Sequence, residues 1–291
     1  MTRPLIMNGI TEINKVSRSN LQEKEREGMA SPQNHDKSQH QGTAITIIVP
    51  VHNEEKRLTP SMRRTIEYCN TEQWDYELVF VEDGSTDKTV EIIQNLASKN
   101  NRIKLVSNPE RLGKGKAIRN AIVHAEKKYI GYMDADLSAD PSEFKRLLGY
   151  IDKFDIVVGS RILRGELPPI ERPFIRSFLS SCYSKLFRIL FWGVTVHDPQ
   201  CGLKLFNSNI AQSLLTQIET NGFAFDCEVI AKASNLGFTI KEVPIIWKHH
   251  YGSKVSILPE IMKMGKDLLS VWYRTKISDS IFNRQARITK S

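Results

Sequence analysis

The sequence predicts an α/β protein, folded as a three-layer α/β/α sandwich around a mainly parallel sheet. Short apolar segments, mostly rich in β-branched residues, recur over residues 45–160, and helix-like segments separate them. These strand-like segments are largely apolar on both faces, which is typical of parallel strands covered by helices on each side. With 291 residues, 40% of them hydrophobic, the chain is long enough to build one large domain or two modest ones.

The expected elements follow one another as repeated strand–helix units. Strands are predicted at 45–51 (ITIIVPV), 77–83 (ELVFVED), 103–106 (IKLV), 129–134 (YIGYMD) and 155–160 (DIVVGS). Helices are predicted between them, at about 54–70, 86–98, 114–127 and 141–152. Because ligands of such sheets collect at the carboxyl ends of the strands, the polar residues found there are the candidates for function.

Both ends of the chain differ in composition from the part between them. Residues 1–43 contain no aromatic residue and lack both a clear period and the apolar core of an export signal, so we interpret them as a disordered polar tail. Residues 44–250 are the expected folded domain. Residues 251–291, with eight Lys or Arg against three Asp or Glu, are an expected basic amphipathic segment. No apolar run approaches the ~20 residues that a membrane-spanning helix needs.

Cysteine usage and charge limit the classes of function. The four cysteines lack CxxC spacing, which argues against a disulfide framework and a zinc site and fits a reducing cytoplasm. The net charge of +8 is compatible with nucleic acid, an anionic membrane surface or simple solvation. A nucleic-acid-binding module is disfavoured because it gives no reason for acidic residues to converge. A dinucleotide oxidoreductase is disfavoured because "GKGKA" does not follow the first strand or make GxGxxG.

Polar groups follow four of the five predicted strands, in "PVHNEE", "EDGSTD", "DAD" and "GSR". Each motif has an ordinary interpretation as a helix N-cap. In this interpretation Asn53, and either Ser85 or Thr86, accept hydrogen bonds from the free N–H groups at a helix start. Their recurrence on one edge of the same sheet favours a binding site. Asp134 and Asp136, in DxD spacing after the fourth strand, would repel each other unless a cation lies between them. Carboxylates of this kind suit Mg²⁺ or Mn²⁺, which can bridge to the phosphates of a substrate.

Two further segments could meet a nucleotide. Asp83 follows the second strand, where its carboxylate could accept the ring N–H of a base while Gly84 lets that base approach the backbone. Gly113, Lys114 and Gly115 lie at a helix start, where a basic turn can bind phosphate. The spacing is not that of a Walker P-loop, and a plain helix start with exposed lysines is the alternative interpretation.

Taken together, the motifs resemble those of family 2 glycosyltransferases of the GT-A fold, which is Rossmann-like. The match covers about Ile45 to Leu269 and consists of "IIVPVHNEE", "VEDGSTDKT", "RLGKGKAIRNA", "YMDADLSADP", "VVGSR", "DPQCGLKLF", "FAFDCEV" and "WKHHYGSKV". The chain most resembles the polyprenyl (dolichyl) phosphate glycosyltransferases and, through "QCGLKLF", "YGSK" and "MGKDLL", the dolichyl-phosphate β-glucosyltransferases. This resemblance implies inverting transfer of a hexose from a nucleotide sugar to a lipid phosphate. UDP-glucose is the first choice of donor and GDP-mannose the second.

The resemblance also implies roles for individual residues. Asp134 and Asp136 would hold the metal, Mg²⁺ or Mn²⁺, and the residues implied in catalysis are Asp136, Arg161, Arg176 and Asp198. The residues implied in binding the nucleotide sugar, the metal and the acceptor phosphate are Pro50, His52, Glu54, Val81, Asp83, Lys114, Asp134, Ala135, Asp136, Arg161, Ser180 and Lys254. His52 stands where relatives often have Tyr, and Ser138 where some have a metal-binding Gln, so the third metal ligand is left open. Asp198 either orients its neighbours or is only a loop residue.

A lipid acceptor implies contact with a membrane surface, and two segments have the matching pattern. Residues 172–192 place Ile175, Phe178, Leu179, Cys182, Tyr183, Leu186 and Leu190 along one helical stripe, with basic residues around it. An ordinary core helix would show the same pattern. Near the C-terminus, Trp272 and Tyr273 lie beside basic residues, as rings do at headgroup depth. We therefore expect a cytoplasmic protein attached peripherally to the cytoplasmic face of a membrane. A family 2 enzyme with a non-lipid acceptor is the alternative.

Overall fold

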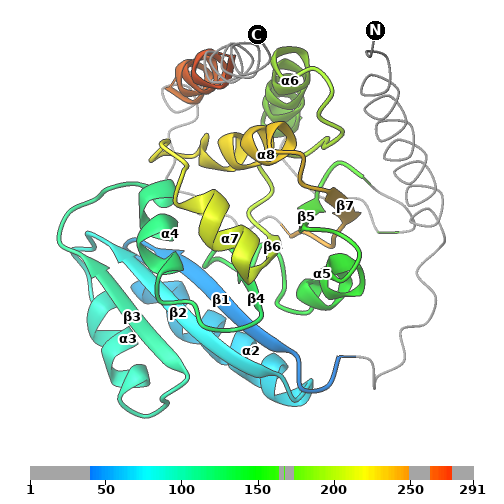
Figure 1. Ribbon diagram of the computed structural model, residues 1–291. Helices are drawn as coiled ribbons and strands as arrows, with labels where there is room; N and C mark the ends of the chain where they lie inside the picture. Colours follow the sequence, from blue (N-terminus) through cyan, green and yellow to red (C-terminus); the bar gives the residue numbers. More distant parts are fainter. Residues whose placement is uncertain (1–39, 164–166, 168–173, 249–262, 277–291) are drawn as a thin grey trace, which may run out of the picture. The chain divides into compact units, whose positions relative to one another are not determined.

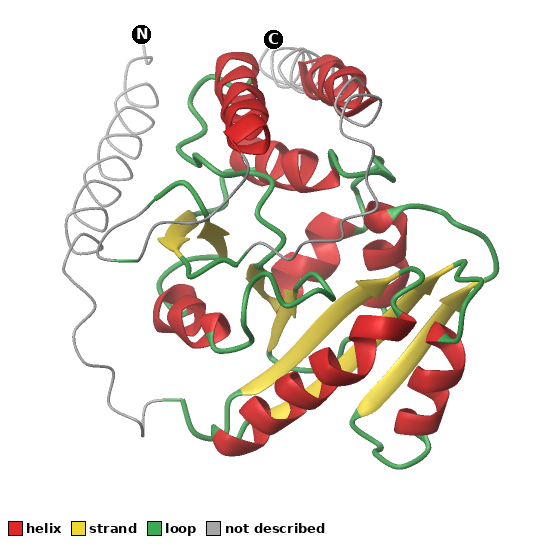
Figure 2. Cartoon of the chain, turned by 180° about the vertical axis from the view of Figure 1, so that it is seen from behind, coloured by secondary structure: helices red, strands yellow, loops and turns green. Residues whose placement is uncertain are grey.

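The computed structural model describes residues 40–163, 167, 174–248 and 263–276, with the backbone alone at 174–178. The chain divides into two compact units, residues 1–39 and residues 40–291, and every described residue belongs to the second. The described part of the domain is drawn in Figure 1 and, from behind, in Figure 2.

One seven-stranded sheet forms the centre of the domain, in the order β3-β2-β1-β4-β6-β5-β7. Six strands are mutually parallel where they pair, whereas β6 runs antiparallel to both of its neighbours, β4 and β5. The strands are β1 (Ala44–Val51), β2 (Asp75–Asp83), β3 (Ile103–Asn108), β4 (Tyr129–Tyr132), β5 (Ile156–Ser160), β6 (Lys204–Asn207) and β7 (Ile240–Pro244). The predicted α/β class and the five predicted strands are confirmed. The strands β6 and β7 were not anticipated.

Helices cover both faces of this sheet, as the apolar character of the strands predicts. They are α2 (Glu55–Thr71), α3 (Thr89–Ala97), α4 (Lys114–Ile122), α5 (Glu143–Ile151), α6 (Phe174–Leu190), α7 (Ser208–Leu215), α8 (Phe225–Asn235) and a further helix over residues 263–276. The four predicted helices correspond to α2–α5. Helix α4 ends at Ile122, five residues before the predicted end.

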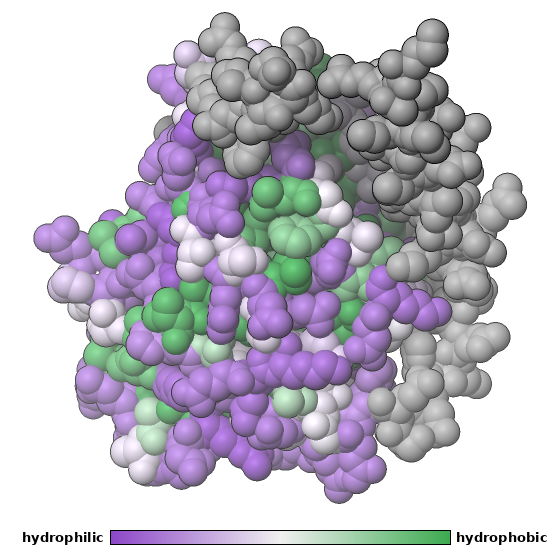
Figure 3. Space-filling model, in the orientation of Figure 1, coloured by the Kyte–Doolittle hydropathy of each residue, from purple (hydrophilic) through white to green (hydrophobic). Residues whose placement is uncertain are grey.

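The alternation of side chains along each strand creates two apolar cores. Ile48 of β1 and Tyr132 of β4 point into a core shared with α4, α6, α7 and α8. Ile47 of β1 and Leu205 of β6 point into the opposite core, which α2, α3 and α5 close. The outer surface on the side shown in Figure 3 is mainly hydrophilic, with apolar side chains gathered near its middle.

Helix 263–276 lies within the segment that the sequence marks as basic and amphipathic. Its Leu268 and Val271 are fully buried in the core beneath α4, α6, α7 and α8. Trp272, expected at headgroup depth, is partly buried and packs against the same core, whereas Tyr273 is 62% exposed. The helix is therefore part of the domain's packing, and only one of the two aromatic residues is available to a surface.

Helix α6 has one face buried in the core, as in a core helix, and another exposed face that carries apolar side chains, as in an interfacial helix. Tyr183, Phe187 and Phe191 are buried against the core, as in an ordinary core helix. Cys182 and Leu186, predicted on the same stripe, lie on the exposed side instead, because contacts spaced four residues apart define a narrower buried face than the sequence suggested. Ile175 and Phe178 belong to the part of α6 whose side chains lie outside the described residues.

Candidate active site

The loops after β1 and β2 hold each other through reciprocal hydrogen bonds. The backbone N–H of Asn53 donates to Ser85 Oγ at 3.0 Å, and the backbone N–H of Thr86 donates to Asn53 Oδ1 at 2.8 Å. His52 Nδ1 lies 2.8 Å from the carbonyl oxygen of Asp83. These side chains cap the neighbouring loop rather than their own helix, since α2 and α3 lack a side-chain cap hydrogen bond at their N-cap residues. The N-cap interpretation was therefore wrong about which N–H groups these side chains bind, although it was right that they accept hydrogen bonds from backbone N–H groups.

Asp83 anchors the loop that leads into α4. Its Oδ1 accepts the N–H of Leu112 at 2.7 Å, its Oδ2 accepts the N–H of Gly113 at 2.9 Å, and the residue is 5% exposed. Gly84 has a φ of +69°, and a Cβ there would lie 2.5 Å from the backbone nitrogen of Arg111. The close approach that requires glycine is thus made by the chain's own backbone. The two residues fix the start of α4 and, with it, Lys114.

Lys114 lies between two carboxylates. Its Nζ is 3.0 Å from Asp134 Oδ1 and 3.1 Å from Asp226 Oδ2. Burial lowers the pKa of the Lys114 ammonium, but the charges of Asp134 and Asp226 outweigh it and the pKa is raised. Burial likewise raises the pKa of Asp226, while Lys114 and Lys204 lower it to about 2. Lys114 is therefore a permanent cation beside the first aspartate of the DxD turn, and the alternative of an exposed lysine is wrong.

The turn that carries Asp134 and Asp136 is held on both sides. Asp136 Oδ1 accepts the N–H of Ser138 at 2.9 Å, and the intervening Ala135 is buried. A Cβ on Gly202, in the "DPQCG" segment, would lie 1.9 Å from Asp134 Oδ2, so glycine is needed there for the two segments to pack. Both aspartates are partly exposed, with the Asp134 side chain 45% exposed.

The donor set of this turn fits a hard divalent cation. Among the described residues, the hydrogen bonds and ion pairs of the two aspartates use Oδ1, from Lys114 and from Ser138. Oδ2 of each can therefore accept a further ligand, although Oδ2 of Asp134 also packs against Gly202. Mg²⁺ and Mn²⁺ accept such oxygens and take the rest of their ligands from water and phosphate. Among the described residues there is no group of three or more His, Cys, Asp or Glu side chains that could hold a metal by themselves. Ser138, the position of the open third ligand, is buried, and its carbonyl accepts the N–H of Lys248 at 2.7 Å.

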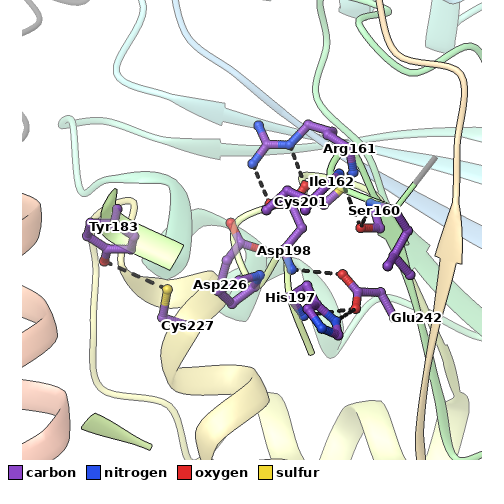
Figure 4. A network of polar contacts seen from close by, with 12 residues as sticks. Ser160, Arg161, Ile162, Tyr183, His197, Asp198, Cys201, Asp226, Cys227 and Glu242 are labelled. Atoms are coloured by element: carbon purple, nitrogen blue, oxygen red, sulfur yellow. Dashed lines mark hydrogen bonds and ion pairs between the residues drawn. The ribbon is translucent and has the colours of Figure 1, made fainter. Parts of the chain in front are cut away.

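Arg161, just beyond β5, forms a bidentate ion pair with Asp198. Arg161 Nε and Nη2 donate to the two oxygens of Asp198 at 2.7 Å each, and its backbone N–H donates to Oδ2 at 2.8 Å. Asp198 is fully buried, and its own N–H donates to Glu242 Oε1 of β7 at 2.8 Å (Figure 4). Burial lowers the pKa of Arg161, but the neighbouring charge of Asp198 raises the pKa by more, so the guanidinium stays charged. Of the two interpretations of Asp198, the geometry favours the residue that orients its neighbours.

Lys204 of β6 and Asp226 of α8 were missed as individual residues. Lys204 is fully buried, and its Nζ donates to Cys201 O at 2.6 Å, Pro199 O at 3.0 Å and Asp226 Oδ1 at 2.6 Å. Tyr132 donates its hydroxyl to the same Asp226 oxygen at 2.7 Å. The signal that could have found the pair is a lysine inside the apolar run "GLKLF", because a charge on a buried strand needs a partner.

The remaining predicted residues occupy separate positions. Pro50 and Val81 pair across β1 and β2. Glu54 forms an ion pair with Arg57 at 2.8 Å. Ser180 lies partly buried on α6. Arg176 is in the backbone-only part of α6 and Lys254 lies outside the described residues, so the structure does not place their side chains.

Solved structures of similar fold place this sheet among the GT-A glycosyltransferases. Glucosyl-3-phosphoglycerate synthase from Mycobacterium tuberculosis, solved with Mn²⁺, UDP and phosphoglyceric acid, superposes with a TM-score of 0.61 at 20% identity. The superposition covers 80% of this chain and 78% of that one. A second crystal structure of the enzyme, with Mg²⁺ and UDP, gives a TM-score of 0.59 at 19% identity, over 80% of this chain and 79% of the other. This similarity confirms the predicted GT-A fold.

Sequence comparison finds relatives over most of the chain. Dolichyl-phosphate beta-glucosyltransferase ALG5D of Trichomonas vaginalis is 34% identical over 80% of this chain and 75% of its own length. The dolichyl-phosphate beta-glucosyltransferase of Saccharomyces cerevisiae is 27% identical over 78% of this chain and 73% of its own. Glycosyltransferase AglD of Haloferax volcanii is 29% identical over 84% of this chain, which spans only 39% of AglD.

The family-level match covers the site from its first strand to α7. Residues 46–215 match the family described as glycosyl transferase family 2, a segment that contains most of β1, all of β2–β6, the DxD turn and the Arg161–Asp198 pair. The sheet, the acidic turn at the carboxyl ends of its strands and this match agree, and the chain belongs to glycosyl transferase family 2.

Proposed function

We propose that this glycosyltransferase transfers glucose from UDP-glucose to dolichyl phosphate with inversion at the anomeric carbon. The observation that carries the proposal is the convergence, at one edge of the sheet, of a DxD turn, a lysine beside it and an arginine fixed by a buried aspartate. Relatives named as dolichyl-phosphate beta-glucosyltransferases, at 27–34% identity, support the choice of sugar and acceptor.

The nucleotide would bind beside the loops after β1 and β2. His52, Asp83 and Glu54 lie on these loops, and Pro50 and Val81 on the strands below them. Asp83 uses each of its oxygens once, on Leu112 and Gly113, and a carboxylate oxygen can accept a second hydrogen bond from a base N–H. The same carboxylate would then fix both the base and the start of α4.

Asp134 and Asp136 would hold a divalent cation together with the diphosphate of the donor. When bound, such a cation stabilises the negative charge that develops on the departing nucleoside diphosphate, by several kcal/mol. Lys114, held beside Asp134, adds a fixed positive charge at the same place. The cation held by the turn and Lys114 of α4 would therefore supply the counter-charge from positions that the fold already fixes.

The acceptor phosphate needs no strong general base, because its second pKa is about 6 and it is largely dianionic at neutral pH. The task of the protein is then to bring two mutually repelling phosphate groups into line with the anomeric carbon. Arg161 is suited to this task, since Asp198 and the backbone hold its guanidinium in one orientation. Arg176 and Lys254 are proposed as further counter-charges.

A membrane surface would bring the lipid to this site. Ile189 and Trp192 at the end of α6 are 71% and 93% exposed, Leu186 is 37% exposed, and Lys185 and Arg188 are exposed beside them. Apolar side chains flanked by basic ones are the pattern of a segment that lies at the interface of an anionic bilayer. Within the described residues, no helix is both long enough and apolar enough to span a bilayer. We propose peripheral attachment, on the cytoplasmic face.

The direct test is transfer from radiolabelled nucleotide sugars to defined acceptors. Purified protein is incubated with UDP-glucose or GDP-mannose and with dolichyl phosphate or 3-phosphoglycerate, each with Mn²⁺ or with EDTA. We expect a lipid-soluble labelled product from UDP-glucose and dolichyl phosphate, abolished by EDTA. A product with GDP-mannose alone would overturn the choice of sugar. Transfer to 3-phosphoglycerate but not to the lipid would overturn the acceptor.

Vesicle flotation tests the surface on α6. Replacing Ile189 and Trp192 together by Glu should weaken binding to vesicles of phosphatidylcholine with 20–30% phosphatidylserine, roughly tenfold or more, because apolar burial and attraction to anionic lipid are both lost. Val123→Glu is the matched control, since Val123 is 70% exposed but lies at the end of α4. Equal vesicle binding by the double variant and the wild type would rule out this surface.

A further inference from the structure

We infer that Lys204 is a positioning residue that holds the two halves of the donor site, the Asp134–Lys114 pair and the Arg161–Asp198 pair, in one arrangement. The inference rests on the proposed use of these pairs to bind a nucleoside diphosphate. Lys204 itself is fully buried on β6, the strand inserted between β4 and β5. This position, between the strands that lead to the two halves, places its ammonium next to groups that contact each of them, the turn before β6 and Asp226.

The first connection runs through the turn before β6. The ammonium of Lys204 donates to the carbonyl oxygens of Pro199 and Cys201, both within this turn. Asp198 at the start of the turn binds Arg161, and Gly202 at its end packs against the carboxylate of Asp134. One buried charge therefore sets the conformation of a turn that touches both halves of the site.

The second connection runs through Asp226. Its Oδ1 accepts hydrogen bonds from Lys204 and Tyr132, and its Oδ2 faces Lys114, which in turn contacts Asp134. These four side chains form a row of alternating charges, in which the contacts run from Lys204 to Asp226, from Asp226 to Lys114 and from Lys114 to Asp134. Because Asp226 is 2% exposed, its negative charge depends on the two lysines rather than on water.

The hydrogen-bonding capacity of Lys204 excludes direct contact with substrate. An ammonium has three donors, and the two carbonyl oxygens and Asp226 account for three acceptors at 2.6–3.0 Å. The residue is also fully buried, so no ligand reaches it. Lys204 acts on the donor only through the turn and through Asp226. Its loss should appear as weaker donor binding and not as the loss of a reacting group.

The test compares UDP binding with stability in three variants. Lys204→Met removes one of the two ammonium groups that balance the buried charge of Asp226, so both the melting temperature and the affinity for UDP with Mn²⁺ should fall, the affinity by about tenfold or more. Lys204→Met with Asp226→Asn restores neutrality, and Asn still accepts from Tyr132 or Lys114. This double variant should recover most of the melting temperature and still bind UDP about tenfold more weakly, because the turn carbonyls remain without their donor.

Lys104→Met is the matched control. Lys104 pairs with Glu77, whose side chain is 5% exposed, at the opposite edge of the sheet, so its loss should lower the melting temperature and leave UDP affinity unchanged. Wild-type UDP affinity in the double variant, or an equal loss of affinity in Lys104→Met, would overturn the positioning role and leave the proposed function intact. A wild-type protein that does not bind UDP would overturn the donor assignment itself, and the inference with it.

Discussion

The two ends of the parallel strands carry similar acidic residues with different surroundings. Near the start of β2, Glu77 is 4% exposed and accepts hydrogen bonds from Thr46 Oγ1 and, at 2.7 Å, from the N–H of Glu126, while Lys104 Nζ lies 2.8 Å away. Just beyond β4, Asp134 pairs with Lys114 through Oδ1 and has a side chain that is 45% exposed. Both carboxylates have a lysine partner, and only one of them is closed to solvent.

This difference separates stability from binding. A buried carboxylate whose oxygens are occupied by protein donors stabilises the fold and has little left to offer a ligand. A half-exposed carboxylate with one oxygen unused can take a cation or a phosphate-bound metal. The DxD turn belongs to the second kind and Glu77 to the first, although an acidic residue beside a lysine is found in both places. What distinguishes the functional end of the sheet is a carboxylate oxygen that can still accept a ligand, rather than the charge of the carboxylate.

Asp136→Asn is expected to have the largest effect on activity. The amide keeps an oxygen that can accept the N–H of Ser138, so the turn should persist, but the charge that would hold a divalent cation is lost. We expect transfer from UDP-glucose to fall at least about 100-fold, with a melting temperature within about 2 °C of the wild type. Radiolabelled transfer assays and thermal unfolding measure the two quantities.

Asp75→Asn is the control for this variant, because Asp75 is likewise a solvent-accessible aspartate, with a 55% exposed side chain, but pairs with Lys127 at the amino end of β2, away from the DxD turn. Its turnover should equal that of the wild type. Full activity in Asp136→Asn would show that the second aspartate of the turn has no metal role.

Glu77→Gln should act on stability and leave transfer unchanged. Burial raises the pKa of Glu77, but hydrogen bonds from Lys104 and Thr46 lower it below its ordinary value of 4.5. A carboxylate with a depressed pKa in the folded state adds stability above its unfolded pKa, and this stability is lost as the pH falls below about 4.5. Urea unfolding at pH 7 should show a loss of about 1–3 kcal/mol in the variant.

The pH dependence of the unfolding free energy is a second way to compare the Glu77→Gln variant with the wild type. Between pH 7 and pH 4, the variant should lose less of its unfolding free energy than the wild type, because it lacks the group whose folded pKa is depressed. Parallel curves for the two proteins would show that Glu77 is not the source of this stability. A fall in transfer that exceeds the loss of folded protein would show that the amino end of the sheet is coupled to the site.

The sequence was sufficient to predict the strands and helices that are marked by a local pattern of apolar residues. Strands β1–β5 and helices α2–α5 are marked by apolar runs and by the change of period between them, and each lies within a few residues of its predicted place. Asp134, Arg161 and Asp198 were identified because motifs preserve them in order along the chain. The contacts among the site residues were not predicted, since the partners lie far apart in the sequence: Arg161 and Asp198 are 37 positions apart, and Lys114 and Asp226 are 112 positions apart.

The strands that sequence reasoning missed depend on distant contacts. β6 is only four residues long and pairs antiparallel between β4 and β5, so neither its length nor its direction follows from the repeated strand–helix pattern. Lys204 opens this strand as a buried charge, against the usual preference for apolar residues, and is explained by Asp226 on α8 together with the carbonyl oxygens of Pro199 and Cys201. The loops after β1 and β2 illustrate the same limit, because their capping side chains serve each other's backbone.

The smallest effect is expected from an ion pair that is open to solvent. Arg64 of α2 donates to Asp140, beyond the DxD turn, at 3.0 and 3.2 Å, and the two side chains are 49% and 36% exposed. Exposed pairs of this kind contribute about 0–1 kcal/mol, because water and salt screen them. Arg64→Ala should therefore lower the unfolding free energy by less than about 1 kcal/mol, with a difference that shrinks further in 0.5 M NaCl, and should leave transfer unchanged. A larger loss of stability, or any loss of transfer, would mean that this pair constrains the DxD turn from outside, and exposure would then no longer separate stabilising carboxylates from functional ones.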